Sequence, residues 1–280
     1  MITIGKASPV RVWAAGIGIG ARTVLRHPIL GLKRLILPVS YWRAAEFSYV
    51  LNRLRVGRLD RVLDLGSPKD LAVLLARYGG CAVVATDILP EAISLSERYA
   101  VAQGVAGKGA GQVWSEVQDG RRMPYADASF HAAFSVSVLE HIPDDGDSAA
   151  IAELARIVKP GGDIVLTVPY AEAYRETFVD RPVYERARRG DEPVFFERHY
   201  DDRALADRLI GPSSCELVDL QLWGEGRLRV ERALRTLGKG SIAVAPVEAL
   251  LAAAFLRPRD AQRGNPMAAF VTLRRRGSPA

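Results

Sequence analysis

Between residues 61 and 170, short β-type runs alternate with stretches in which apolar residues recur at helical spacing. Of all the features of the sequence, this alternation limits the possible folds most strongly. The five runs cover residues 61–66, 82–87, 112–119, 129–139 and 162–170. After the first run, DLAVLLARYG places apolar residues three or four positions apart, which is typical of a helix with one buried face. Strands separated by helices pair in parallel through right-handed crossovers. We therefore expect an α/β fold with a doubly wound, mostly parallel sheet.

Two further β-type runs, at 215–223 and 268–275, bring the expected sheet to seven strands. A long segment separates them where a short hairpin would suffice, and it includes the apolar helical stretch VEALLAAAFL. The expected organisation has four parts: an N-terminal helical arm (1–58), a main domain (59–280), a lid (171–200) and a helical insertion before the last strand (about 225–265).

The arm is basic, and the rest of the chain is not. The whole chain has a net charge of +6, whereas residues 1–60 hold ten Lys or Arg against Glu46 and Asp60, which is +8. Residues 61–280 therefore hold 28 basic and 30 acidic side chains, or −2. A nucleic-acid-binding fold carries positive charge along its binding face. We expect no nucleic-acid partner.

A helical projection of the arm separates its charges from its apolar surface. At about 100° per residue, Arg11, Arg22 and Arg26 fall on one side. The opposite side carries four apolar residues: Val10, Trp13, Ile17 and Val24. The GIGIG segment within this helix follows no strand and lacks G-x-G-x-x-G spacing. We interpret its glycines as helix-packing positions and not as a phosphate loop.

Two alternatives remain open for the arm. It packs on its own domain or on a twin subunit in a homodimer, or it docks on an anionic membrane surface as an amphipathic element. No uncharged apolar run reaches the roughly 18 to 20 residues of a membrane span. The start of the chain also lacks a cleavable signal pattern. We expect a cytoplasmic protein, with peripheral membrane contact as the alternative.

Neither the cysteines nor the histidines have the spacing of metal ligands. Cys81 and Cys215 are far apart and match no redox motif, so we expect buried thiols in a reducing compartment. The four histidines are equally scattered: His27, His131, His141 and His199. We expect no metal.

Carboxylates stand at the ends of the first three strands. Asp64 lies near the end of the first run, Asp87 ends the second and Asp119 ends the third. Carboxyl ends of parallel strands share one edge of the sheet, where ligands bind. Asp87 stands 21 residues after Gly66, a separation typical of an acid that accepts ribose hydroxyls. The pattern indicates a nucleoside-containing ligand.

Several motifs occur together in this region: VLDLG, VVATDI, MPYADASFH, VLEHI and KPGG. In combination they resemble the class I S-adenosylmethionine-dependent methyltransferases, most closely the type 11 group, over residues 61–170. The resemblance implies a Rossmann-like methyltransferase fold and S-adenosylmethionine as cofactor. It also implies an enzyme that methylates a small-molecule or lipid-like acceptor. A noncatalytic interaction protein with a degenerate methyltransferase fold is the alternative.

The resemblance implies eight cofactor-binding residues: Asp64, Gly66, Ser67, Asp87, Ile88, Asp119, Gly120 and Ser135. Asp64 and the Gly66 backbone would face the amino-acid portion of the cofactor. Asp87 would bind the ribose, Ile88 would pack on the adenine, and Asp119 would meet the adenine amino group.

The loop that follows the first strand departs from the family. Relatives generally have further glycines where this chain has SPKD at 67–70. S-adenosylmethionine has no pyrophosphate, so the loop need not form the nest of amides that a dinucleotide requires. Pro68 suits the first turn of a helix, and Asp70 complements its N-terminus. Lys69 would lie near a carboxylate of the ligand or point to solvent.

His141 is the best candidate for a general base, although histidine at this position also serves for packing. Some quinone-acting relatives hold a metal with E-x-x-E-H, and the equivalent positions here are Ser137, Glu140 and His141. The first acid is missing, which argues against that metal. Four aromatic or histidine residues are candidates for the acceptor pocket: Tyr170, Tyr174, His199 and Tyr200.

Overall fold

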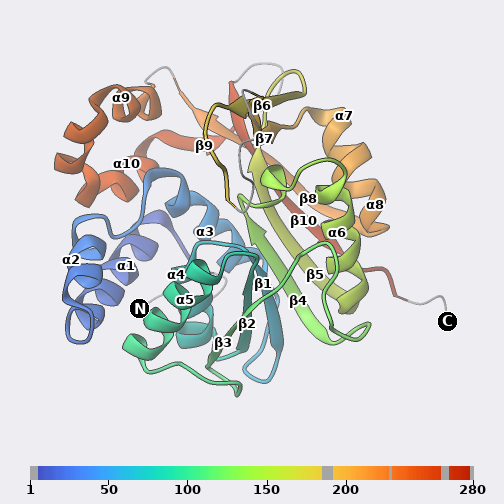
Figure 1. Cartoon of the computed structure of the whole chain (residues 1–280), viewed down its shortest axis with the longest axis horizontal. Coiled ribbons are helices and arrows are strands. Elements are labelled where there is room, and N and C mark those ends of the chain that lie inside the picture. Colours follow the sequence, from blue (N-terminus) through green and yellow to red (C-terminus); the bar gives the residue numbers. More distant parts are fainter. Residues whose placement is uncertain (1–5, 185–191, 227–228, 260–264, 278–280) are drawn as a thin grey trace.

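A computed structural model describes residues 6–184, 192–226, 229–259 and 265–277. Its centre is one eight-stranded sheet with the order β3-β2-β1-β4-β5-β10-β8-β9, and helices cover both faces (Figure 1). The strands are β1 (Arg61–Leu65), β2 (Ala82–Asp87), β3 (Val113–Val117), β4 (Phe130–Val136), β5 (Val158–Pro169), β8 (Glu216–Glu225), β9 (Leu256–Pro258) and β10 (Pro266–Arg274).

The sheet confirms the predicted doubly wound fold. Strands β1 to β5 pair in parallel, and β10 runs antiparallel between β5 and β8. Seven strands match the predicted runs, whereas β9 is an eighth that pairs with β8. Three residues are too few for the period-two pattern that identifies a strand. A separate antiparallel hairpin consists of β6 (Arg175–Val179) and β7 (Val194–His199).

The helices that pack on the two faces of this sheet are α3 (Tyr41–Arg53), α4 (Lys69–Leu74), α5 (Pro90–Gln103) and α6 (Gly146–Ile157). α1 (Pro9–Val24) packs on α3, α4 and α5, and α2 (Pro28–Ile36) packs on α1. Strand residues alternate between the faces as β geometry requires. Val62 of β1 joins the core under α3 and α4, whereas Leu63 and Leu65, which point to the other face, join the core under α6. Cys81 and Cys215 are buried free thiols, as predicted.

The N-terminal arm forms part of the main core, but the predicted apolar face of its first helix is wrong. α1 buries Val12, Ala15, Ile19 and Thr23, whereas Val10 is 47% exposed. The small residues on this side explain why it is the buried side of α1, because they allow neighbouring backbone to approach closely. A Cβ on Gly16 would lie 2.5 Å from the Pro38 carbonyl oxygen. The prediction of helix-packing glycines is therefore confirmed for Gly16 and for Gly20, where a Cβ would lie 3.0 Å from Leu35. It is wrong for Gly18, where a Cβ would meet only the Arg22 side chain at 3.9 Å.

The segment between β8 and β10 contains two helices, α9 (Val230–Leu237) and α10 (Glu248–Phe255), with 3₁₀ turns at Gly238–Ala243 and Ala245–Val247. α10 packs against α1 and α3, so the segment lies beside the arm (Figure 1). Parts of the predicted lid (185–191) and insertion (227–228 and 260–264) lie outside the described residues. Shorter helices follow the hairpin: α7 (Asp202–Ala204) and α8 (Gly211–Ser213). None of the described helices is both long enough and apolar enough to cross a membrane.

Candidate active site

Two cavities meet at the carboxyl edge of the parallel strands. The smaller, of about 150 Å³, lies over the ends of β1, β2 and β3, and the larger, of about 1010 Å³, lies between the hairpin, α3 and α9. Ser137 and His141 line both cavities. A ligand in one cavity would therefore lie next to a ligand in the other at these two residues.

The smaller cavity collects most of the predicted cofactor residues. Five line it directly: Gly66, Asp87, Ile88, Asp119 and Gly120. Gly66 has a φ of +68°, and a Cβ there would lie 2.8 Å from Val138. At Gly120 a Cβ would lie 2.7 Å from Leu65. Glycine at both positions keeps the backbone close to the cavity wall, where a larger residue would force it away.

The other three predicted residues lie beneath the cavity and are fully buried. The Ser67 hydroxyl accepts a hydrogen bond from the Val136 amide at 3.0 Å, and Ser135 donates to the Leu65 carbonyl at 3.0 Å. Asp64 accepts from the Ser67 amide at 3.0 Å through Oδ1. These bonds fix the turn that follows β1 against β4, so these side chains support the cavity floor.

Asp64 retains one carboxylate oxygen without a donor. Its Oδ2 is buried and meets no hydrogen-bond partner among the described residues. Burial raises the pKa of this carboxyl from 3.8 to about 6, against the opposing effect of Lys69. A buried acceptor without a donor is costly, so Asp64 would gain from a cationic group placed beside it.

Lys69 shows how the SPKD loop is held in place without the further glycines of the family. Its ammonium pairs with Asp87 Oδ2 at 2.6 Å, and both side chains are largely buried. Asp87 Oδ1 accepts from the Leu89 amide at 3.0 Å. An ion pair thus connects the SPKD loop to the end of β2. In relatives with further glycines in this loop, close backbone packing can serve instead. Each carboxylate oxygen has two lone pairs, so Asp87 can still accept from a ligand.

Asp119 is held differently. Arg121 pairs with its carboxylate at 2.7 Å, and hydrogen bonds from Arg121 lower the pKa of Asp119. The pair is partly open to solvent and stands at the rim of the smaller cavity. Asp87 and Asp119 lie on neighbouring strand ends, as the predicted sheet order requires.

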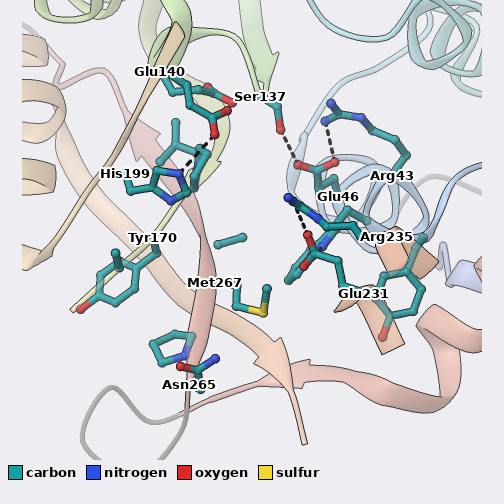
Figure 2. A pocket seen from close by; sticks show the side chains of 18 of the residues that line it. Arg43, Glu46, Ser137, Glu140, Tyr170, His199, Glu231, Arg235, Asn265 and Met267 are labelled. Carbon is teal, nitrogen blue, oxygen red and sulfur yellow. Dashed lines mark hydrogen bonds and ion pairs between the residues drawn. The ribbon is translucent and has the colours of Figure 1, made fainter. Parts of the chain in front are cut away.

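The larger cavity is assembled from segments far apart in the sequence. Its wall comes from the start of α3, the end of β5, the hairpin, α9 and the start of β10. Figure 2 shows its polar side chains, which include Arg43, Glu46, Ser137 and Glu140 near one another, with Glu231 and Arg235 beyond them. Met267 lies on the opposite wall.

Glu46 is the centre of the polar group, and sequence reasoning missed it. Its Oε1 accepts from Ser137 at 2.7 Å and from Thr167 at 2.9 Å, and its Oε2 pairs with Arg43 at 2.7 Å. These bonds join the arm to β4 and β5. Ser137, with a φ of +51°, is held in a conformation that few non-glycine residues adopt. The available signal was that Glu46 and Asp60 are the only acids in the first 60 residues.

Glu140 and His141 line the larger cavity from the turn after β4. Glu140 is 1% exposed, and burial raises its pKa well above the usual value. The His141 Nδ1 lies 2.9 Å from the Phe196 carbonyl oxygen, which requires a proton on that nitrogen. In neutral His141 the Nε2 is then a proton acceptor, 3.8 Å from Glu140 Oε1. No group of three potential ligands among the described residues is arranged to hold a metal ion.

Three of the four predicted aromatic or histidine residues, Tyr170, Tyr174 and His199, line the larger cavity, but Tyr200 does not. Tyr200 is fully buried and donates to Asp147 at 2.9 Å. Arg198, also fully buried, lies 3.3 Å from the same carboxylate. Tyr200 therefore anchors the base of the hairpin to α6, a long-range contact that sequence spacing does not show.

Comparison with known proteins identifies the domain around this edge. The family model described as a methyltransferase domain matches residues 63–166. Residues 63–166 belong to the methyltransferase family. The chain thus carries an S-adenosylmethionine-dependent methyltransferase domain, as its motifs predicted. The matched range runs from β1 through β5 and contains the whole floor of the smaller cavity.

Two curated relatives resemble this chain over about half its length. A demethylmenaquinone methyltransferase of Mycobacterium marinum is 30% identical over 149 residues, covering 53% of this chain and 55% of the relative. A ubiquinone biosynthesis O-methyltransferase of Xanthomonas axonopodis is 30% identical over 131 residues, covering 46% and 51%. The chain therefore spans about half the length of each of these relatives.

A solved structure extends the likeness to the fold of most of the chain. The geranyl diphosphate C-methyltransferase of Streptomyces coelicolor matches with a TM-score of 0.55, at 16% identity. The match covers 87% of this chain and 82% of that one. At this identity the comparison establishes the Rossmann-like methyltransferase fold.

Proposed function

We propose that this chain transfers the methyl group of S-adenosylmethionine to a small-molecule or lipid-like acceptor. The observation that carries the proposal is the junction of the two cavities at Ser137 and His141. Methyl transfer requires donor and acceptor to be held in line with water excluded. Adjacent cavities on one sheet edge can hold the two ligands side by side for such a transfer.

The residues around the smaller cavity fit the cofactor. Its methionine portion carries an ammonium group, which suits the unsatisfied, buried Asp64 Oδ2. Its ribose carries two hydroxyl donors, which suit Asp87 at the end of β2. Ile88 and the Gly120 backbone provide a surface for the adenine. When bound, the cofactor supplies an electrophilic methyl group on a sulfonium.

His141 is placed to take a proton from the acceptor. Its Nδ1 donates to the Phe196 carbonyl, so neutral His141 carries its acceptor lone pair on Nε2, and the residue lines both cavities. A hydroxyl or amine that loses its proton to Nε2 becomes a better nucleophile. His141 would hold this proton as an imidazolium and release it to solvent after the transfer.

The wall of the larger cavity suits an acceptor with both polar and apolar parts. Glu46, Glu140 and Arg43 make the end near Ser137 polar, whereas Leu234, Met267 and Val168 offer apolar contact elsewhere in the cavity. The printed names of the two curated relatives refer to demethylmenaquinone and to ubiquinone biosynthesis. These names agree with an acceptor that has a polar ring and an apolar remainder.

The Lys69–Asp87 ion pair favours a second candidate, a noncatalytic protein with a degenerate methyltransferase fold. Asp87 already has a buried partner at 2.6 Å. If that pair cannot share Asp87, the ribose loses its acceptor.

Isothermal calorimetry with S-adenosylmethionine and S-adenosylhomocysteine separates the two candidates. The enzyme should bind both with micromolar or tighter affinity, whereas the noncatalytic protein should give no heat. A screen of phenols, quinols and amphiphilic hydroxyl compounds for release of S-adenosylhomocysteine then tests the acceptor class. Binding without release on every compound would restrict the proposal to cofactor binding.

A further inference from the structure

An exposed apolar face lies on α2 and the turn before it. Leu25 is 84% exposed, Ile29 74%, Leu32 53% and Ile36 43%. On a helix Ile29, Leu32 and Ile36 lie three or four positions apart and share one side. Leu30, by contrast, packs against the main core. We call Leu25, Ile29, Leu32 and Ile36 the α2 face.

All charged side chains in the sequence around the α2 face are cationic. Residues 1–45 hold seven Lys or Arg and no Asp or Glu. Two of the seven point inward, because Arg34 pairs with Asp70 and Arg43 pairs with Glu46. The other five are exposed: Lys6, Arg11, Arg22, Arg26 and Lys33.

We propose that the α2 face docks on an anionic lipid bilayer. Apolar side chains on one side of a helix, within a segment that holds exposed cations and no acids, have the chemistry of an interfacial membrane element. A second copy of this chain fits less well, because a two-fold interface would bring the same cations together. The face differs from the one predicted on α1, which lies partly inside the fold.

The turns that connect α2 with the larger cavity also carry exposed apolar side chains. α2 packs beside the turn Ala245–Val247, where Val247 is exposed. In the preceding turn Ile242 is 63% exposed, and its neighbour Ser241 lines the larger cavity. A docked molecule would thus hold one rim of this cavity close to the lipid surface. This last step rests on the proposed function, whereas docking itself does not.

The test is co-sedimentation of the full chain with vesicles. One set contains phosphatidylcholine alone, and the other contains phosphatidylglycerol as well. The wild-type chain should bind the anionic vesicles at least tenfold more strongly, and added salt should release it. The double variant Ile29→Ser/Leu32→Ser should lose at least tenfold of this binding. Lys33→Gln should lose about fivefold, as expected for one basic residue near the surface.

Two exposed residues on distant elements supply matched controls. Val218→Ser on β8 removes an exposed apolar side chain, and Arg203→Gln on α7 removes an exposed cation. Both should bind vesicles like the wild-type chain. Circular dichroism should show all variants folded, since each substituted residue is exposed.

Three results would overturn the proposal. The first is equal sedimentation of the wild-type chain with both vesicle types. The second is loss of binding in the controls as large as in the α2 variants. The third is a dimer by light scattering that Ile29→Ser/Leu32→Ser converts to monomer, with no vesicle binding by either. Calorimetry with S-adenosylmethionine on the same samples reports separately on the proposed function.

Discussion

The two cavities differ in how the chain builds them. The smaller one rests on consecutive strand ends within residues 63–166, and its floor is closed by local bonds such as that from the Ser67 amide to Asp64. The larger one joins the arm, the hairpin and the insertion through contacts such as Glu46 to Ser137, 91 positions apart. A local motif can therefore indicate the first cavity, whereas only the folded chain forms the second.

The largest expected effect is the loss of methyl-transfer rate when His141, at the junction between the cavities, is replaced. His141→Asn keeps a side-chain NH that can donate to the Phe196 carbonyl but removes the acceptor at Nε2. If His141 is the base, the methyl-transfer rate on an acceptor found by screening should fall about 10²- to 10⁴-fold. The affinity for S-adenosylmethionine, measured by calorimetry, should change much less than the rate, although His141 also lines the smaller cavity. A rate close to that of the wild type would leave His141 with a packing role.

The next largest effect concerns the ion pair under the smaller cavity. Asp87→Ala leaves the Lys69 ammonium buried and unpaired, so the free energy of unfolding should fall by about 3 to 5 kcal/mol in urea titrations. The cofactor affinity should also fall, because the ribose hydroxyls lose their acceptor.

The double variant Lys69→Met/Asp87→Ala serves as the control. It removes both charges, so it should recover much of the stability but none of the affinity. Recovery of both would remove Asp87 from the cofactor site.

The protonation of Asp64 should make the free energy of unfolding depend on pH. Since burial raises its pKa from 3.8 to about 6, Asp64 stabilises the fold below pH 3.8, and this contribution is lost as the pH rises through 6. Asp64→Asn removes that loss. The variant should gain up to about 3 kcal/mol over the wild-type chain between pH 4 and pH 7.

The same Asp64→Asn variant should bind S-adenosylmethionine about tenfold more weakly at pH 7, because the cofactor ammonium loses an anionic partner. Asp207→Asn, an exposed carboxylate change on the surface, should leave both quantities unchanged. Tighter binding by the Asp64→Asn variant would contradict a place for the ammonium beside Asp64.

The smallest expected effect comes from Glu46, which lines the larger cavity and not the smaller one. Glu46→Gln keeps an oxygen for Ser137 and Thr167 but loses the ion pair with Arg43. We expect the free energy of unfolding to fall by about 2 kcal/mol, with S-adenosylmethionine affinity unchanged because Glu46 does not line the smaller cavity. The KM for the acceptor should rise. Weakened cofactor binding would show that the two cavities are coupled.

Local periodicity was enough to predict the sheet and the positions of its acids. The period of two in runs such as VLDLG and the helical period between them depend on neighbouring residues, so seven strands were predicted close to their true bounds. The placement of Asp87 and Asp119 on one edge followed from parallel pairing alone. The short β9 could not be predicted, because three residues carry no period.

By itself the sequence thus determined the fold class, the methyltransferase domain and the acids at its strand ends. Only the tertiary structure decided which face of α1 is buried, that Lys69 pairs with Asp87, and that Glu46 reaches Ser137. The reason is physical. Secondary structure and strand-end positions follow from interactions between near neighbours, whereas ion pairs and helix faces are chosen by packing among distant segments.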